Sequence, residues 1–167
     1  LIVTLPFILR EREFFDRARR LPIDSYFALL KPTVSSEKSS HPVKTVYLSG
    51  GHYSGWQESV MKEASGFEFK DPSKNGLIDP RLYTEWDLEA IRSSDIVFAY
   101  FEDSNPGGYG LSLEIGYAAA LGKHIILVDE KSLHSTDAGR YLKIVRATSN
   151  VVFDSLSEGI NYLKSLS

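Results

Sequence analysis

The order of apolar and polar segments predicts five strands from residue 43 onward. The segments 95–101 (DIVFAYF) and 124–130 (HIILVDE) are almost continuously apolar, which is typical of central parallel strands buried on both faces. Three shorter segments, 43–49, 66–72 and 151–153, are rich in β-forming residues and are bounded by turn formers. Each of these segments is therefore expected to form a strand.

Segments with helical spacing separate these strands. The predicted helices cover residues 56–64, 81–94, 111–122 and 155–166. A regular alternation of strands and helices favours an α/β fold, here a three-layer doubly wound parallel sheet of about five strands, flavodoxin-like or Rossmann-like, in a single domain. In such folds ligands bind beyond the carboxyl ends of the strands. We therefore look for function in the loops that follow 43–49, 95–101 and 124–130.

Residues 1–42 do not share this pattern. The segment 11–20 (EREFFDRARR) is compatible with an amphipathic helix, and 32–42 is rich in Pro and Ser, as linkers are. We interpret 1–42 as an N-terminal arm and linker in which residues 1–40 bind a protein partner. Residues 43–167 are then the catalytic domain.

Composition narrows the classes of function. The net charge is −3, so no global field attracts the chain to nucleic acid or to an anionic membrane. The absence of cysteine excludes disulfides, thiolate metal sites and cysteine nucleophiles, and the four histidines show no metal-ligand spacing. We therefore expect a cytoplasmic protein without a built-in metal site that binds neither nucleic acid nor membrane.

Three residues stand out as candidates for chemistry. Glu114 lies in a helix of mostly small and apolar residues, just after a glycine-rich loop, and a half-buried carboxylate there must be paired, protonated or used. The alternative is an exposed glutamate stabilised by the helix dipole. Asp87 has the same alternative as a first-turn acid, and Tyr47, on the first strand, has that of a core tyrosine.

The first strand ends in a turn suited to ligand binding. Ser49, Gly50 and Gly51 resemble a backbone nest for an anion or a ribose hydroxyl. They form neither a Walker loop nor a complete GxGxxG fingerprint. Asp95, at the start of a buried strand, is expected to bond backbone groups and to be structural.

Taken together, three blocks resemble the nucleoside 2-deoxyribosyltransferase family, including its nucleotide N-glycosidase relatives. They are TVYLSGG (45–51), WDLEAIRSSDIVFAYF (86–101) and GYGLSLEIGYAAALGKHIILV (108–128). The resemblance implies that Glu114 attacks the anomeric carbon, that Tyr47 orients this carboxylate, and that Asp87 contacts or protonates the departing base. It also implies a reaction that needs no metal or organic cofactor, and a homodimer or larger homo-oligomer.

One position departs from the family pattern. Transferases commonly carry an aspartate six residues before the nucleophile, for the sugar 5′-hydroxyl, and the monophosphate hydrolases a serine, whereas this chain has Gly108. The amides of Gly108 and Gly110 are candidates for binding phosphate, and Asp103, in the same loop, for replacing the aspartate. The first hypothesis is cleavage of a (2′-deoxy)nucleoside or nucleotide by a deoxyribosyltransferase-like enzyme. The alternatives are a 2′-deoxynucleoside 5′-monophosphate N-hydrolase, an NAD glycohydrolase and a non-catalytic nucleotide-binding module.

Overall fold

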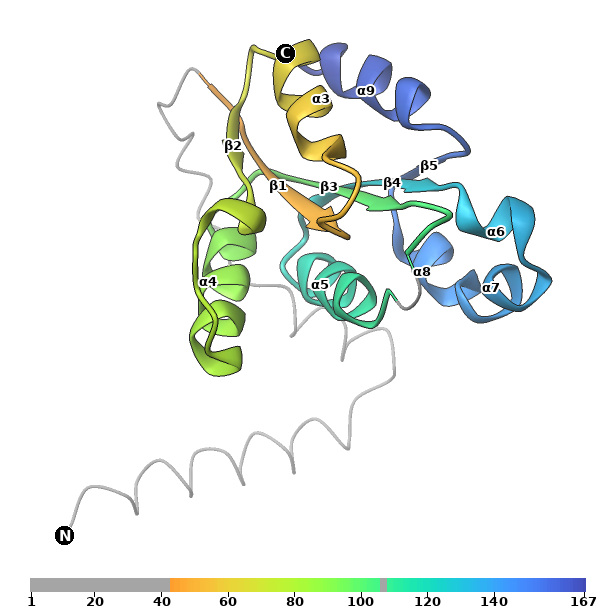
Figure 1. Ribbon diagram of the computed structural model, residues 1–167. Helices are drawn as coiled ribbons and strands as arrows, with labels where there is room; N and C mark the ends of the chain where they lie inside the picture. Colours follow the sequence, from red (N-terminus) through yellow and green to blue (C-terminus); the bar gives the residue numbers. More distant parts are fainter. Residues whose placement is uncertain (1–42, 106–107) are drawn as a thin grey trace, which may run out of the picture. The chain divides into compact units, whose positions relative to one another are not determined.

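A single sheet of five parallel strands, in the order β2-β1-β3-β4-β5, forms the centre of the fold (Figure 1). The strands are β1 (Thr45–Gly50), β2 (Glu68–Lys70), β3 (Ile96–Phe101), β4 (His124–Asp129) and β5 (Val151–Phe153). The computed structural model describes residues 43–105 and 108–167. The expected α/β fold with about five parallel strands is confirmed, whereas the helix expected at 11–20 and the linker at 32–42 lie outside the described residues.

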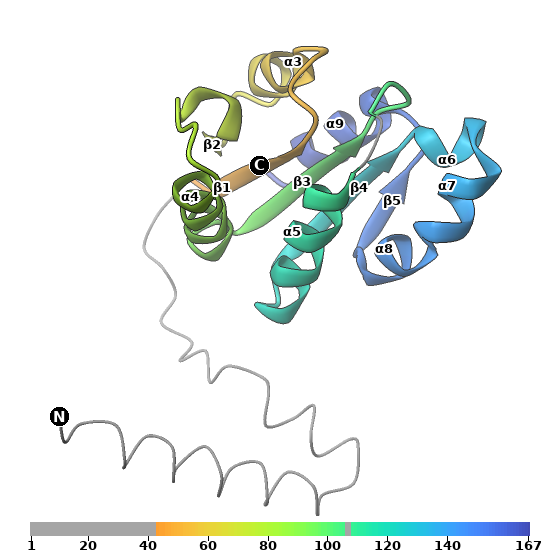
Figure 2. The ribbon, with the colours of Figure 1, turned by 60° about the horizontal axis from the view of Figure 1, so that its bottom comes forward.

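Helices cover both faces of this sheet (Figures 1 and 2). On one face, α3 (Trp56–Glu63) and α9 (Leu156–Lys164) pack against the side chains of one core cluster, which includes Val46 and Leu48 of β1. The other face is covered by α4 (Pro80–Arg92), α5 (Tyr109–Ala120) and α8 (Lys143–Thr148). The result is the expected three-layer arrangement.

Strand β1 divides its side chains between the two layers. Successive side chains of a strand point to opposite faces, so Tyr47 and Ser49 face α4 and α5 while Val46 and Leu48 face α3 and α9. Tyr47 pairs with Val97 of β3 in the parallel register. The chain leaves β1 toward one face and β3 toward the other, which makes the β1–β3 boundary the switch point of the sheet.

The segment between β4 and β5 contains helices that the sequence pattern did not predict. These are α6 (Lys131–His134), α7 (Thr136–Tyr141) and α8. Each has four to six residues, too few to show a helical repeat of apolar positions. Ser135 starts α7, because its hydroxyl accepts a hydrogen bond from Ala138 N at 3.1 Å. A short 3₁₀ turn, η1 (Pro72–Lys74), was missed for the same reason.

The opposite, amino-terminal edge of the sheet is fixed by Asp95. Its Oδ2 atom accepts a hydrogen bond from Thr45 N at 2.8 Å, joining the start of β3 to the start of β1. Asp95 therefore bonds a backbone group, as expected from the sequence. This contact lies away from the edge where ligands bind in such sheets.

Candidate active site

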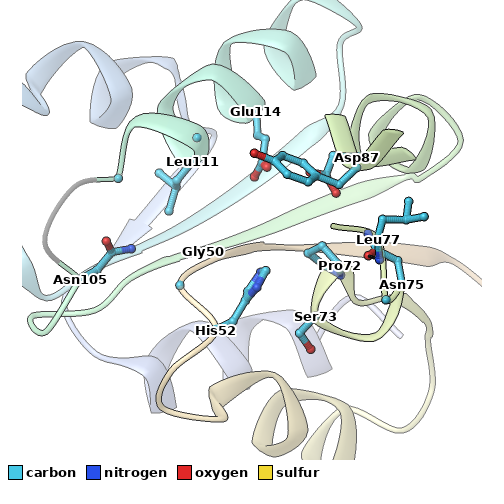
Figure 3. Close-up of a pocket in the computed structure, with 15 residues that line it drawn as sticks. Gly50, His52, Pro72, Ser73, Asn75, Leu77, Asp87, Asn105, Leu111 and Glu114 are labelled. Carbon is cyan, nitrogen blue, oxygen red and sulfur yellow. Dashed lines mark hydrogen bonds between the residues drawn. The ribbon is translucent and has the colours of Figure 1, made fainter. Parts of the chain in front are cut away.

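A cavity of about 510 Å³ lies at the carboxyl edge of the sheet, at the ends of β1 and β3 (Figure 3). Its lining consists of Gly50, Gly51, His52, Pro72, Ser73, Asn75, Gly76, Leu77, Tyr83, Asp87, Asn105, Gly108, Gly110, Leu111 and Glu114. Among the described residues that form this lining, none is a lysine or an arginine, and two are carboxylic acids. The cavity thus lies at the switch point that the fold predicts for a ligand.

Glu114 enters the cavity from α5, held by two hydroxyl groups of β1. The Ser49 hydroxyl donates a hydrogen bond to Oε2 at 2.5 Å, and the Tyr47 hydroxyl donates one to Oε1 at 3.2 Å. Because α5 begins at Tyr109, Glu114 lies in the second helical turn, and it is not exposed. The alternative of a solvated glutamate at the helix N-terminus does not describe this residue.

The pKa of Glu114 is raised to about 7, mainly by burial and also by the nearby Asp87 carboxyl, while the hydrogen bonds from Ser49 and Tyr47 act in the opposite direction. The two hydroxyl donors therefore stabilise the ionised form of a carboxyl group that is partly removed from water. A carboxyl group with a pKa near neutrality exchanges its proton readily at physiological pH. Perturbed carboxyl groups in cavities are typical of catalytic sites.

Asp87 enters the same cavity from α4 (Figure 3). The helix begins at Pro80, after Asp79, whose side chain accepts hydrogen bonds from Arg81 N and Leu82 N. Asp87 is thus well inside the helix rather than in its first turn. Its Oδ1 atom is buried without a hydrogen-bond partner in the described part of the chain. Burial raises the pKa of Asp87, while the Tyr47 hydroxyl and the charge of His52 lower it.

Tyr47 connects the two carboxyl groups. Its side chain is fully buried, and burial raises its pKa above the ordinary value, with the charges of Glu114 and Asp87 acting in the same direction. The phenol therefore stays protonated and remains a hydrogen-bond donor at every physiological pH. Its interactions with Glu114 and Asp87 place the three side chains that the sequence analysis singled out in one cluster.

The turn after β1 is held rigidly from α3. Gly51 O accepts hydrogen bonds from Trp56 Nε1 at 2.7 Å and from Gln57 Nε2 at 2.9 Å. A Cβ atom on Gly50 would lie 2.5 Å from Tyr100 O, so only glycine fits between β1 and β3 at this position. Gly50 and Gly51 therefore form one wall of the cavity. Gln57 supports this wall through its hydrogen bond to Gly51 O, and the sequence analysis did not identify Gln57.

The other candidate residues are placed differently. Ser49 is fully buried behind Glu114 and is not part of the cavity lining. Asp103 is exposed and does not line the cavity either. Gly108 and Gly110 do line it, at the start of α5, where Gly108 adopts a left-handed backbone conformation with φ of 83°. The structure thus brings the glycines to the site but not Asp103.

Sequence reasoning also missed one side of the cavity. The segment after β2 contributes Pro72, Ser73, Asn75, Gly76 and Leu77, and Asn75 Oδ1 accepts a hydrogen bond from Leu77 N at 2.9 Å. Because β2 neighbours β1, its following loop reaches the same edge of the sheet. The turn-forming composition of 71–76 marks this stretch as a loop. Together with the strand order, this signal would have placed the loop at the site.

Comparisons with known proteins identify the family. The model of the nucleoside 2-deoxyribosyltransferase-like family matches residues 43–132 of this chain, more than half of its length. The chain belongs to this family. The match contains Tyr47, Asp87 and Glu114. No curated protein sequence matches the chain.

Three solved structures have a similar fold, and two of them are enzymes. A CMP N-glycosidase from Clostridium botulinum is 26% identical, with a TM-score of 0.52, and the alignment covers 74% of this chain and 100% of that one. A 2-desoxiribosyltransferase from Leishmania mexicana is 22% identical, with a TM-score of 0.56, covering 73% of this chain and 97% of that one. A conserved protein from Enterococcus faecalis V583 is 16% identical, with a TM-score of 0.56 and coverages of 75% and 99%. The latter two likenesses establish the fold alone.

No group of three or more His, Cys, Asp or Glu side chains with the geometry of a metal site occurs in 43–105 or 108–167. In the same part of the chain, no helix is both long and apolar enough to span a bilayer.

Proposed function

We propose that this protein cleaves the N-glycosidic bond of a nucleoside or nucleotide, with Glu114 as the nucleophile. The observation that carries the proposal is the Glu114 carboxyl group itself, which faces a cavity and is held by Ser49 and Tyr47 in hydrogen bonds of 2.5 and 3.2 Å. Membership of the nucleoside 2-deoxyribosyltransferase-like family supports this class of reaction.

In the first step, an oxygen of ionised Glu114 attacks the anomeric carbon of the sugar. A C–O bond forms to the carboxylate as the C–N bond to the base breaks, and its electron pair moves to the base nitrogen. This transition state has oxocarbenium character, which a neighbouring carboxylate stabilises. The Tyr47 and Ser49 hydroxyls fix the carboxylate in position, and this lowers the entropy that the attack costs.

Asp87 acts on the leaving base. A base departs more easily when a proton or a strong hydrogen bond reaches one of its acceptor atoms as negative charge develops there. The pKa of Asp87 is raised by burial, which favours the protonated, hydrogen-bond-donating form relative to an exposed aspartate. We assign the base to the end of the cavity where Asp87, Asn75 and Leu77 lie together (Figure 3).

In the second step, the ester between Glu114 and the sugar is broken by an acceptor. If water attacks the anomeric carbon, its proton leaves to solvent or to a carboxylate and the product is a free sugar. If a ring nitrogen of a second base attacks, its proton passes to the Asp87 carboxylate or to solvent, and the products are a new nucleoside and the free Glu114 carboxylate. Neither step changes an oxidation state. The two steps therefore use only Glu114, Asp87 and Tyr47 of the cluster together with the substrate and the acceptor.

A second candidate is hydrolysis of a 5′-monophosphate. Two observations favour it: Gly108 places no carboxylate where a phosphate would approach, and the CMP N-glycosidase from Clostridium botulinum is 26% identical to this chain. NAD glycohydrolase activity would use Glu114 in the same way but requires room for a second nucleotide.

Chromatography of released bases tests the proposal. The protein is incubated with deoxynucleosides, their 5′-monophosphates and NAD, with and without a second free base. We expect base release that falls by at least about 1000-fold in Glu114→Gln, which keeps the size of the side chain but not its nucleophilicity. Glu63→Gln, an exposed change on α3, is the matched control and should leave the rate unchanged.

Mass spectrometry of the acid-quenched protein adds an independent test. A sugar bound to Glu114 should appear during turnover of the wild type and be absent from Glu114→Gln. Release of no base from any of these substrates would refute the proposal. Formation of a new nucleoside that carries the added acceptor base, rather than of free sugar, then separates transfer from hydrolysis. A homodimer or larger assembly stays a prediction, which light scattering can check.

A further inference from the structure

The carbonyl oxygen of Gly51 is held from the start of α3. Trp56 Nε1 donates a hydrogen bond to it at 2.7 Å, and Gln57 Nε2 donates a second at 2.9 Å. Trp56 and Gln57 are each only 3% exposed, so little water can compete for this oxygen. A buried side-chain amide lowers stability unless it is hydrogen-bonded, and the bond to Gly51 O meets this need for Gln57. The carbonyl group therefore points toward α3 and is fixed there by two donors.

The direction of this carbonyl group determines the direction of the next amide. The peptide bond between Gly51 and His52 is trans, and in a planar trans peptide the C=O and N–H bonds point in opposite directions. Helix α3 packs on one face of the sheet, whereas α4 and α5, which carry Asp87 and Glu114, cover the other face. The N–H of His52 therefore points away from α3, toward the side on which the two carboxyl groups lie.

This amide is available to a ligand. Among residues 43–105 and 108–167, no backbone carbonyl accepts a hydrogen bond from His52 N. Gly51 and His52 both line the catalytic cavity (Figure 3). The charge of His52 also acts on the carboxyl group of Asp87, so His52 lies within electrostatic range of the end of the cavity that is assigned to the base. The His52 amide is thus a fixed donor near that end.

A departing base carries an acceptor atom beside its glycosidic nitrogen. This atom is O2 in a pyrimidine and N3 in a purine, and it takes part of the negative charge that develops as the C–N bond breaks. Asp87 acts on one acceptor of the base, which leaves a second acceptor to be stabilised. A backbone N–H that is already oriented stabilises such charge well, because it needs no reorganisation during the reaction.

From this geometry we propose that the His52 N–H donates a hydrogen bond to O2 or N3 of the leaving base, and that Gln57 is the positioning residue that aims it. The inference rests on the proposed function, since it concerns the departing base. Gln57 is not part of the cavity lining and acts through Gly51 O alone. The preferred substrates are then nucleosides or nucleotides whose base keeps an acceptor at this position.

The kinetic test uses pairs of substrates that differ at this one atom. 3-Deaza-2′-deoxyadenosine has carbon in place of N3, and 2-thio-2′-deoxyuridine has sulfur, a weaker acceptor, in place of O2. In Gln57→Leu we expect kcat/KM for the parent 2′-deoxyadenosine or 2′-deoxyuridine to fall about fivefold or more, and kcat/KM for its analogue to change less than about twofold. Glu63→Gln, an exposed change on the same helix, should alter neither value. An equal loss for both members of a pair overturns the inference.

A second variant removes the donor without disturbing α3. Semisynthesis with the α-hydroxy acid analogue of histidine at position 52 replaces the amide by an ester and deletes only the N–H. We expect kcat/KM for the parent substrate to fall about tenfold or more, and that for the analogue to change little. Full activity of the ester protein on the parent substrate contradicts the inference, whatever the effect of Gln57→Leu on folding.

A binding test separates this inference from the proposed function. The probes are the free bases adenine and uracil and their analogues 3-deazaadenine and 2-thiouracil, which have no glycosidic bond to cleave. In ¹H–¹⁵N spectra we expect the amide proton of His52 to move downfield on binding of adenine or uracil, and to move less with the matching analogue. No such difference for either base overturns the inference. A downfield shift that depends on the acceptor, without base release from any substrate, would instead refute only the proposed function.

Discussion

The hydroxyl of Ser49 donates a 2.5 Å hydrogen bond to the Oε2 atom of Glu114 from a position that is fully buried. Ser49 thus stands behind the proposed nucleophile, on its β1 side, and is not part of the cavity lining. A donor in that position stabilises the ionised carboxyl group and fixes its orientation. Its effect is therefore expected on the pKa of Glu114 rather than on substrate affinity.

Replacement of Ser49 by alanine should weaken catalysis at neutral pH. The hydrogen bond lowers the pKa of Glu114, so its loss raises that pKa and leaves less of the ionised nucleophile. A hydrogen bond to a charged group contributes roughly 1.5–3 kcal/mol, so we expect kcat/KM at pH 7 to fall about tenfold or more. Ser49→Thr, which keeps the hydroxyl, is the control, and an equal loss in both variants would contradict the explanation.

The pH profile of the wild type should show an acidic limb near pH 7. Glu114 must be ionised to attack, and burial raises its pKa to about 7. The value of kcat/KM should therefore decrease as the pH falls below about 7 and level off above it, until another group titrates. Stopped assays of base release between pH 5 and 9 measure this, with an apparent pKa near 4.5 as the outcome that contradicts it.

Asp87→Asn should move this acidic limb to lower pH. The charge of Asp87 raises the pKa of Glu114, so removing the charge lowers it. This direction is opposite to that expected for Ser49→Ala, and the pair of variants therefore tests the electrostatic account by the sign of the shift. The maximal rate of Asp87→Asn should also fall, because the base loses its acid. A shift in the same direction in both variants would refute the account.

Glu114→Gln should stabilise the protein above neutral pH while abolishing turnover. The pKa of Glu114 is higher in the folded protein than the ordinary value of 4.5, so the folded state favours the protonated form. The resulting stability is present below pH 4.5 and is lost as the pH rises through about 7. We expect the variant to gain on the order of 3 kcal/mol at most at pH 8.5 and almost nothing at pH 4.5. Urea unfolding at the two pH values measures the difference, with Glu63→Gln as control.

Gly159→Ala should destabilise the fold, whereas Gly116→Ala should not. A Cβ atom on Gly159 would lie 2.4 Å from Val128 Cγ2 and 3.1 Å from Phe98 Cζ, where α9 meets the sheet, but one on Gly116 meets nothing within 4 Å. We expect a loss of about 1–3 kcal/mol for the first variant and a gain of about 0.5–1 kcal/mol for the second. Thermal unfolding compares them, and equal melting temperatures would contradict the packing argument.

The layers of the fold and the centre of the site follow from local sequence features. The segments 95–101 and 124–130 are almost continuously apolar, and this pattern predicts central parallel strands that are buried on both faces. Tyr47 and Glu114 come from separate segments, yet the common rule that ligands bind at the carboxyl edge brought them together as candidates. The structure places their side chains 3.2 Å apart, between the Tyr47 hydroxyl and Glu114 Oε1.

Other features depend on relations between distant residues and have no local signal. The support of Gly51 O by Gln57 depends on how α3 meets β1, and the position of Asn75 at the cavity depends on β2 pairing with β1. Asp103 belongs to the expected loop, but loop conformation turns it to solvent. The short helices between β4 and β5 form because tertiary contacts stabilise them, and propensity alone does not specify them.

The alternation of side chains along β1 has a consequence for how faithfully the protein folds. If β1 slid by one residue, Val46 and Leu48 would replace Tyr47 and Ser49 in front of α5, and the buried carboxyl group would face two hydrocarbon side chains. In such a misaligned chain the Glu114 carboxyl group would have no hydrogen-bond donor from β1, and this would lower the stability of the fold by roughly 1–3 kcal/mol or more. The proposed nucleophile therefore favours the correct register of β1, and a molecule with the wrong register would lack the hydrogen bonds that hold Glu114.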